Sequence, residues 1–128
     1  MAKGINPEDI RVVLVCGGRK YSNYGRVTEV MDHVLSDARD EGKTLRIIQG
    51  GATGADELAM CWAVLRQVAY VCEPAEWVKL GLKAGPVRNA RMLSLWNPDF
   101  VIAFPGGKET KDMVAKARKY GLEVYEKD

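Results

Sequence analysis

Hydrophobic residues occur along this chain in two alternating patterns. Short unbroken runs rich in Val, Ile and Phe are typical of buried strands, and they occur at residues 11–16, 45–49, 68–72 and 100–104. A shorter run at 123–125 predicts a closing strand. Between these runs, hydrophobic residues recur every three or four positions, which is the spacing of one face of a helix. The chain therefore alternates predicted strands with predicted helices.

Four helices are predicted in the intervals between the strands. The first is expected to end before Gly42 and the last to run from about Thr110 to Gly121, because glycine is common directly after a helix. Pro86 is expected near the start of the third helix, where proline is tolerated, and the segment around Trp77 is expected to be irregular. The predicted hydrophobic faces are, in chain order, Val27, Val30, Met31, Val34, Leu35 and Ala38; Ala55, Leu58, Ala59, Trp62 and Leu65; Met92, Leu95 and Trp96; and Met113, Ala117 and Tyr120.

This order of elements predicts the fold class. Strands separated by helices of ten or more residues indicate βαβ units. Right-handed crossovers then give a mainly parallel sheet of about five strands, with helices on both of its faces. A length of 128 residues is typical of one domain. The sequence therefore predicts a single Rossmann-like α/β domain over residues 1–128, with its core at about 11–125.

Composition narrows the class of partner. The chain is 47% hydrophobic and 28% charged, as in ordinary globular proteins, and its formal net charge is +2. So small a charge argues against strong binding to a nucleic-acid backbone. No hydrophobic run approaches the roughly 20 residues that a membrane span needs, and residues 1–7 lack the hydrophobic core of a signal peptide. A cytoplasmic protein without a membrane partner is expected.

The cysteines and the single histidine argue against a metal site. Cys16, Cys61 and Cys72 are widely spaced, and His33 is the one histidine that might join them. Neither a disulfide framework nor a structural zinc site has this spacing. Cys16 and Cys72 lie in hydrophobic runs, so both are expected to be buried thiols in a reducing compartment.

Glycine gives the first indication of a binding site. Of the 13 glycines, six form three pairs, and each pair directly follows a predicted strand: Gly17-Gly18, Gly50-Gly51 and Gly106-Gly107. In a parallel sheet these loops meet at one edge, where ligands commonly bind. Glycine permits close backbone approach, and helix N-termini attract anions. A glycine in such a loop also serves turn geometry alone, but three equivalent pairs favour a phosphate or nucleotide site.

Side chains beside the glycines support this hypothesis. Arg19 follows the first pair, and Arg88 and Arg91 lie one turn apart in the third predicted helix. An arginine binds phosphate with two parallel hydrogen bonds, although a solvated basic helix face explains this pair of arginines as well. Thr53 and Asp56 have the spacing of a capping box, which is a purely structural alternative for both.

Common nucleotide-binding motifs do not match. No Gly-Lys is followed by Ser or Thr as in a P-loop, and Ala52 and Ala55 occupy positions where the dinucleotide-binding fingerprint requires glycine. The chain also lacks the G-x-S-x-G element of the α/β-hydrolases. Basic residues next to aromatic ones, as in Arg19-Lys20-Tyr21, are too few for a nucleic-acid platform.

In combination, these motifs resemble the SLOG superfamily of Rossmann-like proteins, and within it the small branch related to YspA and cpYpsA. The resemblance covers about 11–125 and is carried by Gly17-Gly18-Arg19, by residues 50–56, by Arg88-Asn89-Ala90-Arg91-Met92 and by Pro105-Gly106-Gly107 with Thr110. It implies binding of a nucleotide or an ADP-ribose-like ligand, in a group common in bacteria and their phages and often dimeric. The implied ligand-binding residues are Gly17, Gly18, Arg19, Gly50, Gly51, Thr53, Gly54, Asp56, Arg88, Asn89, Pro105, Gly106, Gly107 and Thr110.

The same resemblance extends to the LOG phosphoribohydrolases, which use an arginine and a glutamate. Arg88 is similar in place to their arginine, whereas Met113 stands where their glutamate is expected. Methionine neither accepts a proton nor stabilises a sugar cation. Met113 is also expected in the core, because it falls on the hydrophobic face of the last helix.

Three functional hypotheses follow. The favoured one is a binding module that holds phosphate with the glycine loops, Arg19 and Arg88, and a base against Tyr21, Trp77 or another aromatic side chain. The alternative is a nucleotide-cleaving hydrolase with Arg88 and Asp56 as its catalytic residues, for which Glu57 and Glu109 are further candidate carboxylates. A DNA-associated protein, by kinship with the Smf proteins, is the weakest. No metal and no cofactor apart from a bound nucleotide is expected.

Overall fold

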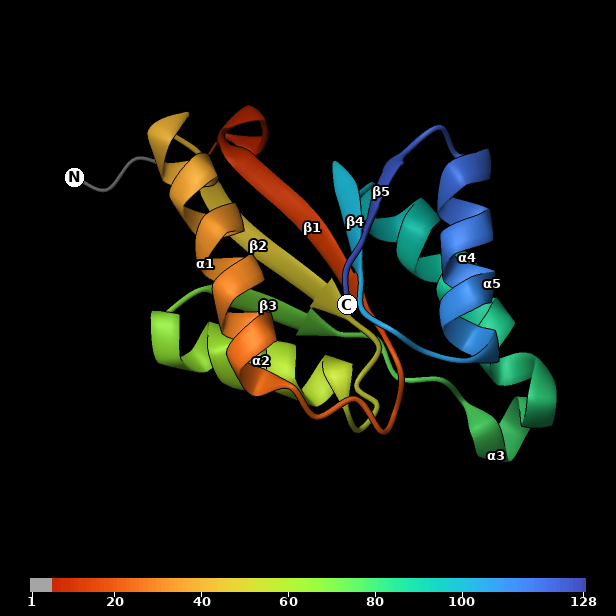
Figure 1. Cartoon of the computed structure of the whole chain (residues 1–128). Helices are drawn as coiled ribbons and strands as arrows, with labels where there is room; N and C mark the ends of the chain where they lie inside the picture. Colours follow the sequence, from red (N-terminus) through yellow and green to blue (C-terminus); the bar gives the residue numbers. More distant parts are fainter. Residues whose placement is uncertain (1–5) are drawn as a thin grey trace.

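The computed structural model describes residues 6–128 and contains one five-stranded sheet. All its strand pairs are parallel. In sheet order the strands are β3 (Ala69–Cys72), β2 (Thr44–Gln49), β1 (Ile10–Cys16), β4 (Phe100–Ala103) and β5 (Glu123–Glu126) (Figure 1). The predicted Rossmann-like α/β fold is confirmed.

Helices cover both faces of this sheet. On one face lie α1 (Tyr24–Asp40) and α2 (Ala55–Arg66), and on the other lie α4 (Ala84–Trp96) and α5 (Lys108–Lys119) (Figure 1). Three short elements complete the chain: η1 (Pro7–Asp9), α3 (Trp77–Leu80) and η2 (Gly81–Lys83). The segment around Trp77, expected to be irregular, thus contains a helical turn.

The central strand β1 shows how the sequence pattern forms the core. Its side chains alternate between the faces, so Val13 and Val15 pack with α1 and α2, while Leu14 and Cys16 pack with α4 and α5. These four residues are all buried, as expected for a parallel strand covered on both faces. The thiol of Cys16 is therefore a core group, and burial raises its pKa to about 12.

Some predicted burial is wrong at the margins of the domain. Cys72 is exposed because β3 is an edge strand of the sheet. Leu65, Leu95 and Tyr120 were expected on hydrophobic helix faces but are 66%, 58% and 56% exposed. Each of them lies in the last turn of its helix or directly after it.

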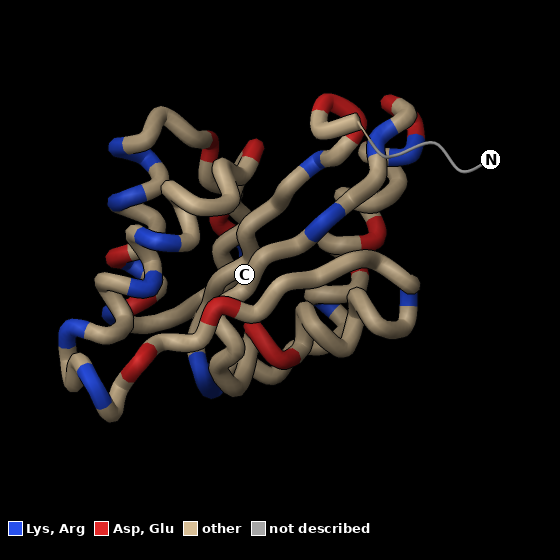
Figure 2. Tube along the Cα trace, turned by 180° about the vertical axis from the view of Figure 1, so that it is seen from behind, with Lys and Arg blue, Asp and Glu red and all other residues tan. Residues whose placement is uncertain are grey.

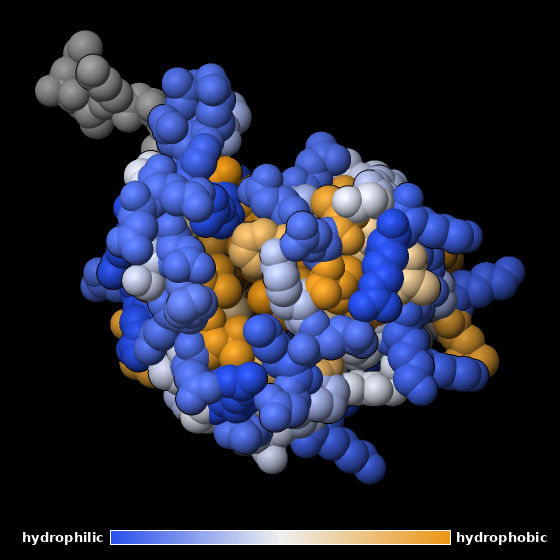
Figure 3. Space-filling view, turned by 45° about the horizontal axis from the view of Figure 1, so that its top comes forward, coloured by the Kyte–Doolittle hydropathy of each residue, from blue (hydrophilic) through white to orange (hydrophobic). Residues whose placement is uncertain are grey.

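The path of the chain leaves part of one sheet face uncovered. α1 and α2 pack over the side of the sheet formed by β1, β2 and β3, so no helix among the described residues covers β4 and β5 on that face. The uncovered strands form a groove of about 580 Å³ beside α1, with a hydrophobic floor between charged rims (Figure 3). The hydrophobic residues that line it are Val30, Val34, Phe100, Ile102 and Tyr125.

The order of strands also reverses next to β1. The chain moves outward from β1 to β2 and β3, then returns to β4 on the other side of β1. The chain therefore leaves β1 and β4 toward helices on opposite faces of the sheet, and ligands of open α/β folds bind at the carboxyl edge beside such a reversal. Within residues 6–128, no helix is long and hydrophobic enough to cross a membrane, and no group of three acidic, Cys or His side chains is placed to hold a metal.

Candidate functional site

A small polar recess opens at this carboxyl edge, between the glycine loops and α4. The sequence-predicted residues that line it are Gly17, Gly18, Arg19, Gly50, Asp56, Arg88, Asn89, Gly107 and Thr110. The remaining lining residues are Val15, Cys16, Ala52, Met92 and Glu109. Met92 is one helical turn after Arg88, a spacing that identifies it once α4 is known to face the recess.

The three glycine loops are joined to one another through Gly18. Its N–H donates to the Pro105 carbonyl at 2.8 Å, and its carbonyl accepts a hydrogen bond from the Ala55 N–H at 3.1 Å. Side chains are excluded at the contacts: a Cβ on Gly54 would lie 2.2 Å from the Gly18 oxygen, and one on Gly106 would lie 2.6 Å from the Gly18 nitrogen. These two glycines therefore allow the loops to pack together and do not line the recess.

Three other predicted binding residues also lie outside the lining. Pro105 holds Gly18 as described, while Gly51 has a φ of +73°, a conformation that favours glycine. Thr53 donates a hydrogen bond to the Arg19 carbonyl at 3.2 Å. Thus Thr53 fastens the second glycine loop to the first.

The capping box considered as a structural alternative for Thr53 and Asp56 is absent. Its N-cap residue is Gly54, without a side-chain cap, because a φ of +77° at Gly54 separates Thr53 from the first helical turn. Asp56 instead accepts a hydrogen bond at 3.2 Å from the N–H of Ala52, which lies in the loop before α2. Both side chains therefore shape the loop, and Asp56 also faces the recess.

Arg88 is the principal charged group of the recess. It is 8% exposed, so the solvated basic face considered for it is wrong. Its Nη1 donates to the Gly50 carbonyl at 2.8 Å and the Glu73 carbonyl at 3.3 Å, and its Nε donates to Asn89 Oδ1 at 3.0 Å. No hydrogen bond joins its Nη2 to any of residues 6–128. The Arg88 guanidinium is thus held by its Nε and Nη1 atoms, and Nη2 remains available to donate a hydrogen bond to a ligand.

The glycine at position 50 makes this placement of Arg88 possible. A Cβ there would lie 2.2 Å from Arg88 Nη1 and 3.0 Å from Asp56 Oδ2. Gly50 therefore has a direct role in the site, since only a residue without a side chain leaves room for both charged groups. The neighbouring Arg91, by contrast, is bound to Glu73 at 3.2 Å and does not line the recess.

Asp56 and Arg88 attract one another electrostatically, whereas burial disfavours the charge on each of them. Asp56 is 5% exposed, and burial raises its pKa to about 6, against the lowering effect of the Ala52 N–H and the Arg88 charge. Burial likewise lowers the pKa of Arg88, while Asp56 raises it. Asp56 therefore changes its charge close to neutral pH.

The start of α5 forms the wall opposite the glycine loops. Asn89 donates to the Glu109 carbonyl at 3.0 Å and to Asp112 Oδ2 at 3.1 Å, which ties α4 to this helix. The N-cap residue Gly107 makes no side-chain cap, and space around it is open. Uncapped N–H groups at a helix start attract anions. Thr110 is buried in this first turn.

Trp77 lies beside the recess, in contact with the lining residue Arg19. The Arg19 guanidinium lies over its ring, 4.9 Å from the centroid, and a Cβ on Gly85 would contact the ring edge at 3.4 Å. Tyr21, the other aromatic candidate, packs against Phe104 with ring centroids 5.2 Å apart and donates its hydroxyl to the Asp128 carbonyl. Trp77 is therefore the aromatic candidate that the fold brings to the site.

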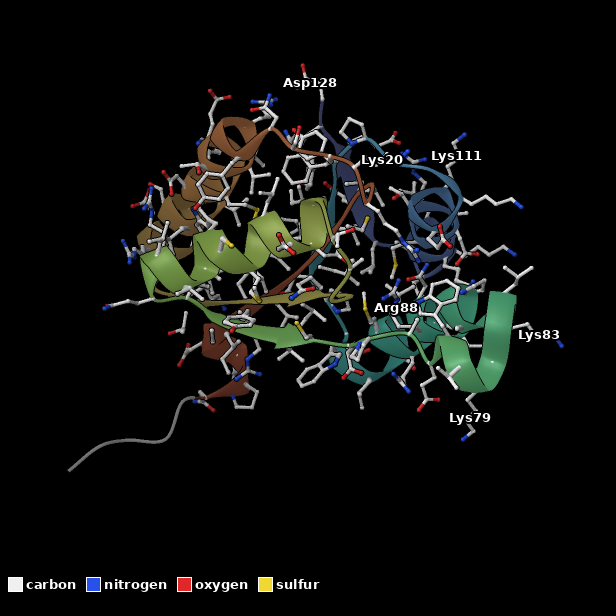
Figure 4. All side chains as sticks on the ribbon, turned by 90° about the horizontal axis from the view of Figure 1, so that it is seen from below. Lys20, Lys79, Lys83, Arg88, Lys111 and Asp128 are labelled. Carbon is white, nitrogen blue, oxygen red and sulfur yellow. The ribbon has the colours of Figure 1, made fainter. Side chains whose placement is uncertain are left out.

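Four lysines lie on the same side of the molecule as Arg88. Figure 4 labels Lys20, Lys79, Lys83 and Lys111, which come from the loop after β1, from α3, from η2 and from α5, at the outer surface around Arg88. None of these lysines forms an ion pair with any of residues 6–128. Figure 2 shows the wider trend, because Lys and Arg gather on the side of the molecule formed by α3, α4 and α5. The region near the recess is thus basic although the whole chain carries only +2.

The candidate carboxylates differ in position. Met113 is 1% exposed and belongs to the core, as its helix face predicts. Glu57 is exposed on α2 and does not line the recess, whereas Glu109 does. Asp56 and Glu109 are therefore the carboxylates near the space that a ligand would occupy.

Comparison with known proteins places this arrangement in a family. The YspA, cpYpsA-related SLOG family matches residues 11–79, which include the first two glycine pairs and Trp77. The chain belongs to this SLOG family. Arg88 and the third glycine pair lie beyond the matched part, so their place in the site rests on the structure.

Two relatives extend the likeness over most of the chain. The Gene 61 protein of Mycobacterium phage D29 is 33% identical over 122 residues, which cover 90% of this SLOG protein and 94% of the relative. The X-ray structure of TM1055, a structural genomics target, has a TM-score of 0.67 at 20% identity and covers 90% of this chain and 72% of its own. The second likeness supports the fold alone.

Proposed function

We propose that this SLOG protein binds a nucleotide or a nucleotide-derived ligand of the ADP-ribose type, with a phosphate in the recess. The unpartnered Nη2 of the buried Arg88 carries the proposal. This nitrogen has no hydrogen bond to residues 6–128 and is open to solvent in the recess, so an anion there would accept a charge-assisted hydrogen bond from it. Arg19 and the uncapped start of α5 add positive potential around the same point.

The size of the recess suggests which part of the ligand enters it. Its cavity volume is about 50 Å³, which corresponds to a few water molecules at ~10–15 Å³ each. One phosphate group fits such a space, and a whole nucleotide does not. The sugar and base would then lie beside the recess, where Arg19 and Trp77 are.

The test is the thermal stability of the protein with AMP, ADP, ADP-ribose and inorganic phosphate. A ligand at about 100 times its dissociation constant adds roughly 2.7 kcal/mol to the free energy of unfolding, which raises Tm by several degrees in a domain of this size. Arg88→Met removes the guanidinium and is expected to abolish the shift. Arg19→Ala, at an exposed residue, is expected to reduce it without loss of folding.

A matched control is Lys119→Ala at the far end of α5, which should leave the shift unchanged. The proposal fails if none of the nucleotides stabilises the unmodified protein. It also fails if Arg19→Ala and Lys119→Ala behave alike and Arg88→Met, once shown to be folded, keeps the shift.

Cleavage of a nucleotide at the same site is the second candidate, and the raised pKa of Asp56 favours it. A buried carboxyl with a pKa of about 6 is suited to proton transfer near neutral pH. Arg88 would hold the phosphate while Asp56 acts on the glycosidic bond. Incubation with AMP or ADP-ribose, followed by analysis for free base and ribose phosphate, tests this candidate. Product formed equally by Asp56→Asn would exclude Asp56 as the acid.

We favour binding over cleavage because Met113 replaces the carboxylate that the resemblance to the LOG enzymes leads one to expect. We further propose that the partner is a free small molecule and not nucleic acid, since the net charge is only +2. Mass spectrometry of small molecules released from the purified protein would identify the ligand directly.

A further inference from the structure

We infer that Trp77 is the platform on which the base of the ligand stacks, and that the base takes the place now held by the Arg19 guanidinium. This inference rests on the proposed binding of a nucleotide. It adds a specificity-determining residue, because a platform of this kind distinguishes a nucleotide from a phosphorylated sugar or from phosphate alone.

The first support is the way in which Trp77 is held. Its ring edge lies against Gly85 at the start of α4, where a Cβ would contact it at 3.4 Å. The same Cβ would lie 3.0 Å from the Glu109 side chain, which lines the recess. The ring of α3 therefore packs on α4 at the same residue that the Glu109 side chain of α5 approaches, and this packing holds it next to the recess.

The second support is that Trp77 remains accessible. It is 38% exposed, while Trp62 is fully buried in the core and Trp96 is partly buried with its indole N–H donated to Glu73 at 3.1 Å. Trp62 also donates its N–H, to Asp32 at 2.8 Å. Trp77 is the tryptophan without a hydrogen bond to residues 6–128, as expected for a ring used through its face.

The third support is the state of Arg19, which covers that face. Its guanidinium forms no hydrogen bond and no ion pair with any of residues 6–128, so the contact with Trp77 is its main attachment. Stacking of a base on an aromatic side chain stabilises a complex more than an exposed cation–π contact does. A base therefore displaces Arg19 from the ring at little cost.

The displaced Arg19 has a second place to go. It lines the recess as well as covering Trp77, so a turn of its side chain brings the guanidinium toward the phosphate. One residue then occupies the platform in the free protein and contributes to charge neutralisation in the complex. The base and the phosphate would thus be recognised by neighbouring residues on separate elements.

The experiment compares AMP with ribose 5-phosphate, which share the phosphate and differ in the base. Affinities are measured by calorimetry for the unmodified protein, Trp77→Phe and Trp77→Leu, with Tyr120→Leu as a control at an exposed aromatic residue (56% exposed). The unmodified protein is expected to bind AMP about tenfold more tightly than ribose 5-phosphate, as one stacked base provides. AMP should also change the indole fluorescence, and ribose 5-phosphate should change it less.

Trp77→Leu is expected to lower the affinity for AMP about tenfold, to the level of ribose 5-phosphate, whose own affinity stays within about twofold. Trp77→Phe should keep most of the preference, because phenylalanine also offers an aromatic face. A purely structural role would lower both affinities equally, and that result overturns the inference while the proposed function stands. If the unmodified protein binds neither AMP nor ribose 5-phosphate, the inference fails, whereas the proposed function fails only if ADP and ADP-ribose also give no stabilisation.

Discussion

The recess at the carboxyl edge and the groove on the sheet face are opposite in character. The recess has a cavity volume of about 50 Å³, and the groove has about 580 Å³. The recess nevertheless contains two buried charged groups, Arg88 and Asp56, one of which has an unused donor. The groove has a hydrophobic floor, and charges on its rim are paired within the chain, as in Arg11–Glu41 and Arg26–Glu29. Chemistry, more than volume, identifies the binding site.

Both features follow from the same chain path. Between β3 and β4 the chain crosses to the second face of the sheet and returns beside β1. This reversal of strand order places the candidate binding site at the carboxyl edge. The same return leaves β4 and β5 without a helix on the first face. The groove is therefore a consequence of topology, whereas the recess also requires particular residues, such as glycine at position 50.

The largest expected effect concerns the charge buried in the recess. Burial raises the pKa of Asp56 from 3.8 to about 6, and one pKa unit corresponds to about 1.4 kcal/mol. The protonated group favours the folded state, so this contribution is complete below about pH 4 and is lost as pH rises through about 6. Relative to Asp56→Asn, the unmodified protein should lose roughly 2 to 3 kcal/mol of stability between pH 3 and pH 7.

Urea unfolding at several pH values measures this difference directly, since contributions from other groups cancel between the two proteins. If the stabilities of the two proteins change with pH in parallel, ionisation of Asp56 does not destabilise the fold. The contrast between a recess with costly buried charges and the groove would then be weaker.

The next effect tests whether Gly50 is required. Gly50→Ala places a methyl group 2.2 Å from Arg88 Nη1 and forces the guanidinium from its position. We expect a loss of about 2 kcal/mol in the free energy of unfolding, typical of overpacking. We also expect the stabilisation by nucleotide to disappear. Thermal unfolding with and without AMP reports both, and an unchanged AMP shift would mean that Arg88 is not the phosphate ligand.

A smaller effect is expected in the groove. Tyr125 packs edge-on against Phe100, with ring centroids 5.4 Å apart, and is 42% exposed. Tyr125→Ser should lower the free energy of unfolding by about 1 kcal/mol through loss of this contact. It should leave the nucleotide-induced Tm shift unchanged. A lost shift would show that the groove contributes to the site, and the contrast between the two cavities would then be wrong.

The smallest effect is expected at Gly107, which also lines the recess. A Cβ at this residue meets no atom within 4 Å. Gly107→Ala should therefore change the free energy of unfolding by about 0.5 kcal/mol or less. It is the matched control for Gly50→Ala. Equal destabilisation by the two substitutions would show that glycine is needed for chain flexibility and not for space beside Arg88.

The sequence was sufficient for the fold because its periodic patterns are local. The run at 11–16 predicted the central strand β1, and the helical spacing from Val27 to Ala38 predicted the face of α1 that is buried. Glycine pairs after the strands marked the carboxyl edge before any geometry was known. These signals depend on the alternation of side chains along an element, which the sequence records directly.

The details of the site depended on contacts between distant residues. The roles of Gly54 and Gly106 follow from their close approach to Gly18. The position of Trp77 follows from the packing of its ring edge against Gly85. The spacing of Thr53 and Asp56 suggested a capping box, but a positive φ at Gly54 separates them. Such contacts arise from packing between loops, and no local pattern in the sequence encodes them.

The joining of three loops at Gly18 has a consequence for how relatives of this protein can diverge. An insertion in the first glycine loop would break hydrogen bonds to the other two, and an insertion in either of those would break its hydrogen bond to Gly18, so their lengths are constrained together. The segment from Trp77 to Lys83 has no such ties, and Val78 and Leu82 within it are almost fully exposed. Changes of ligand preference are therefore expected to accumulate in this segment, while the phosphate end of the site stays the same.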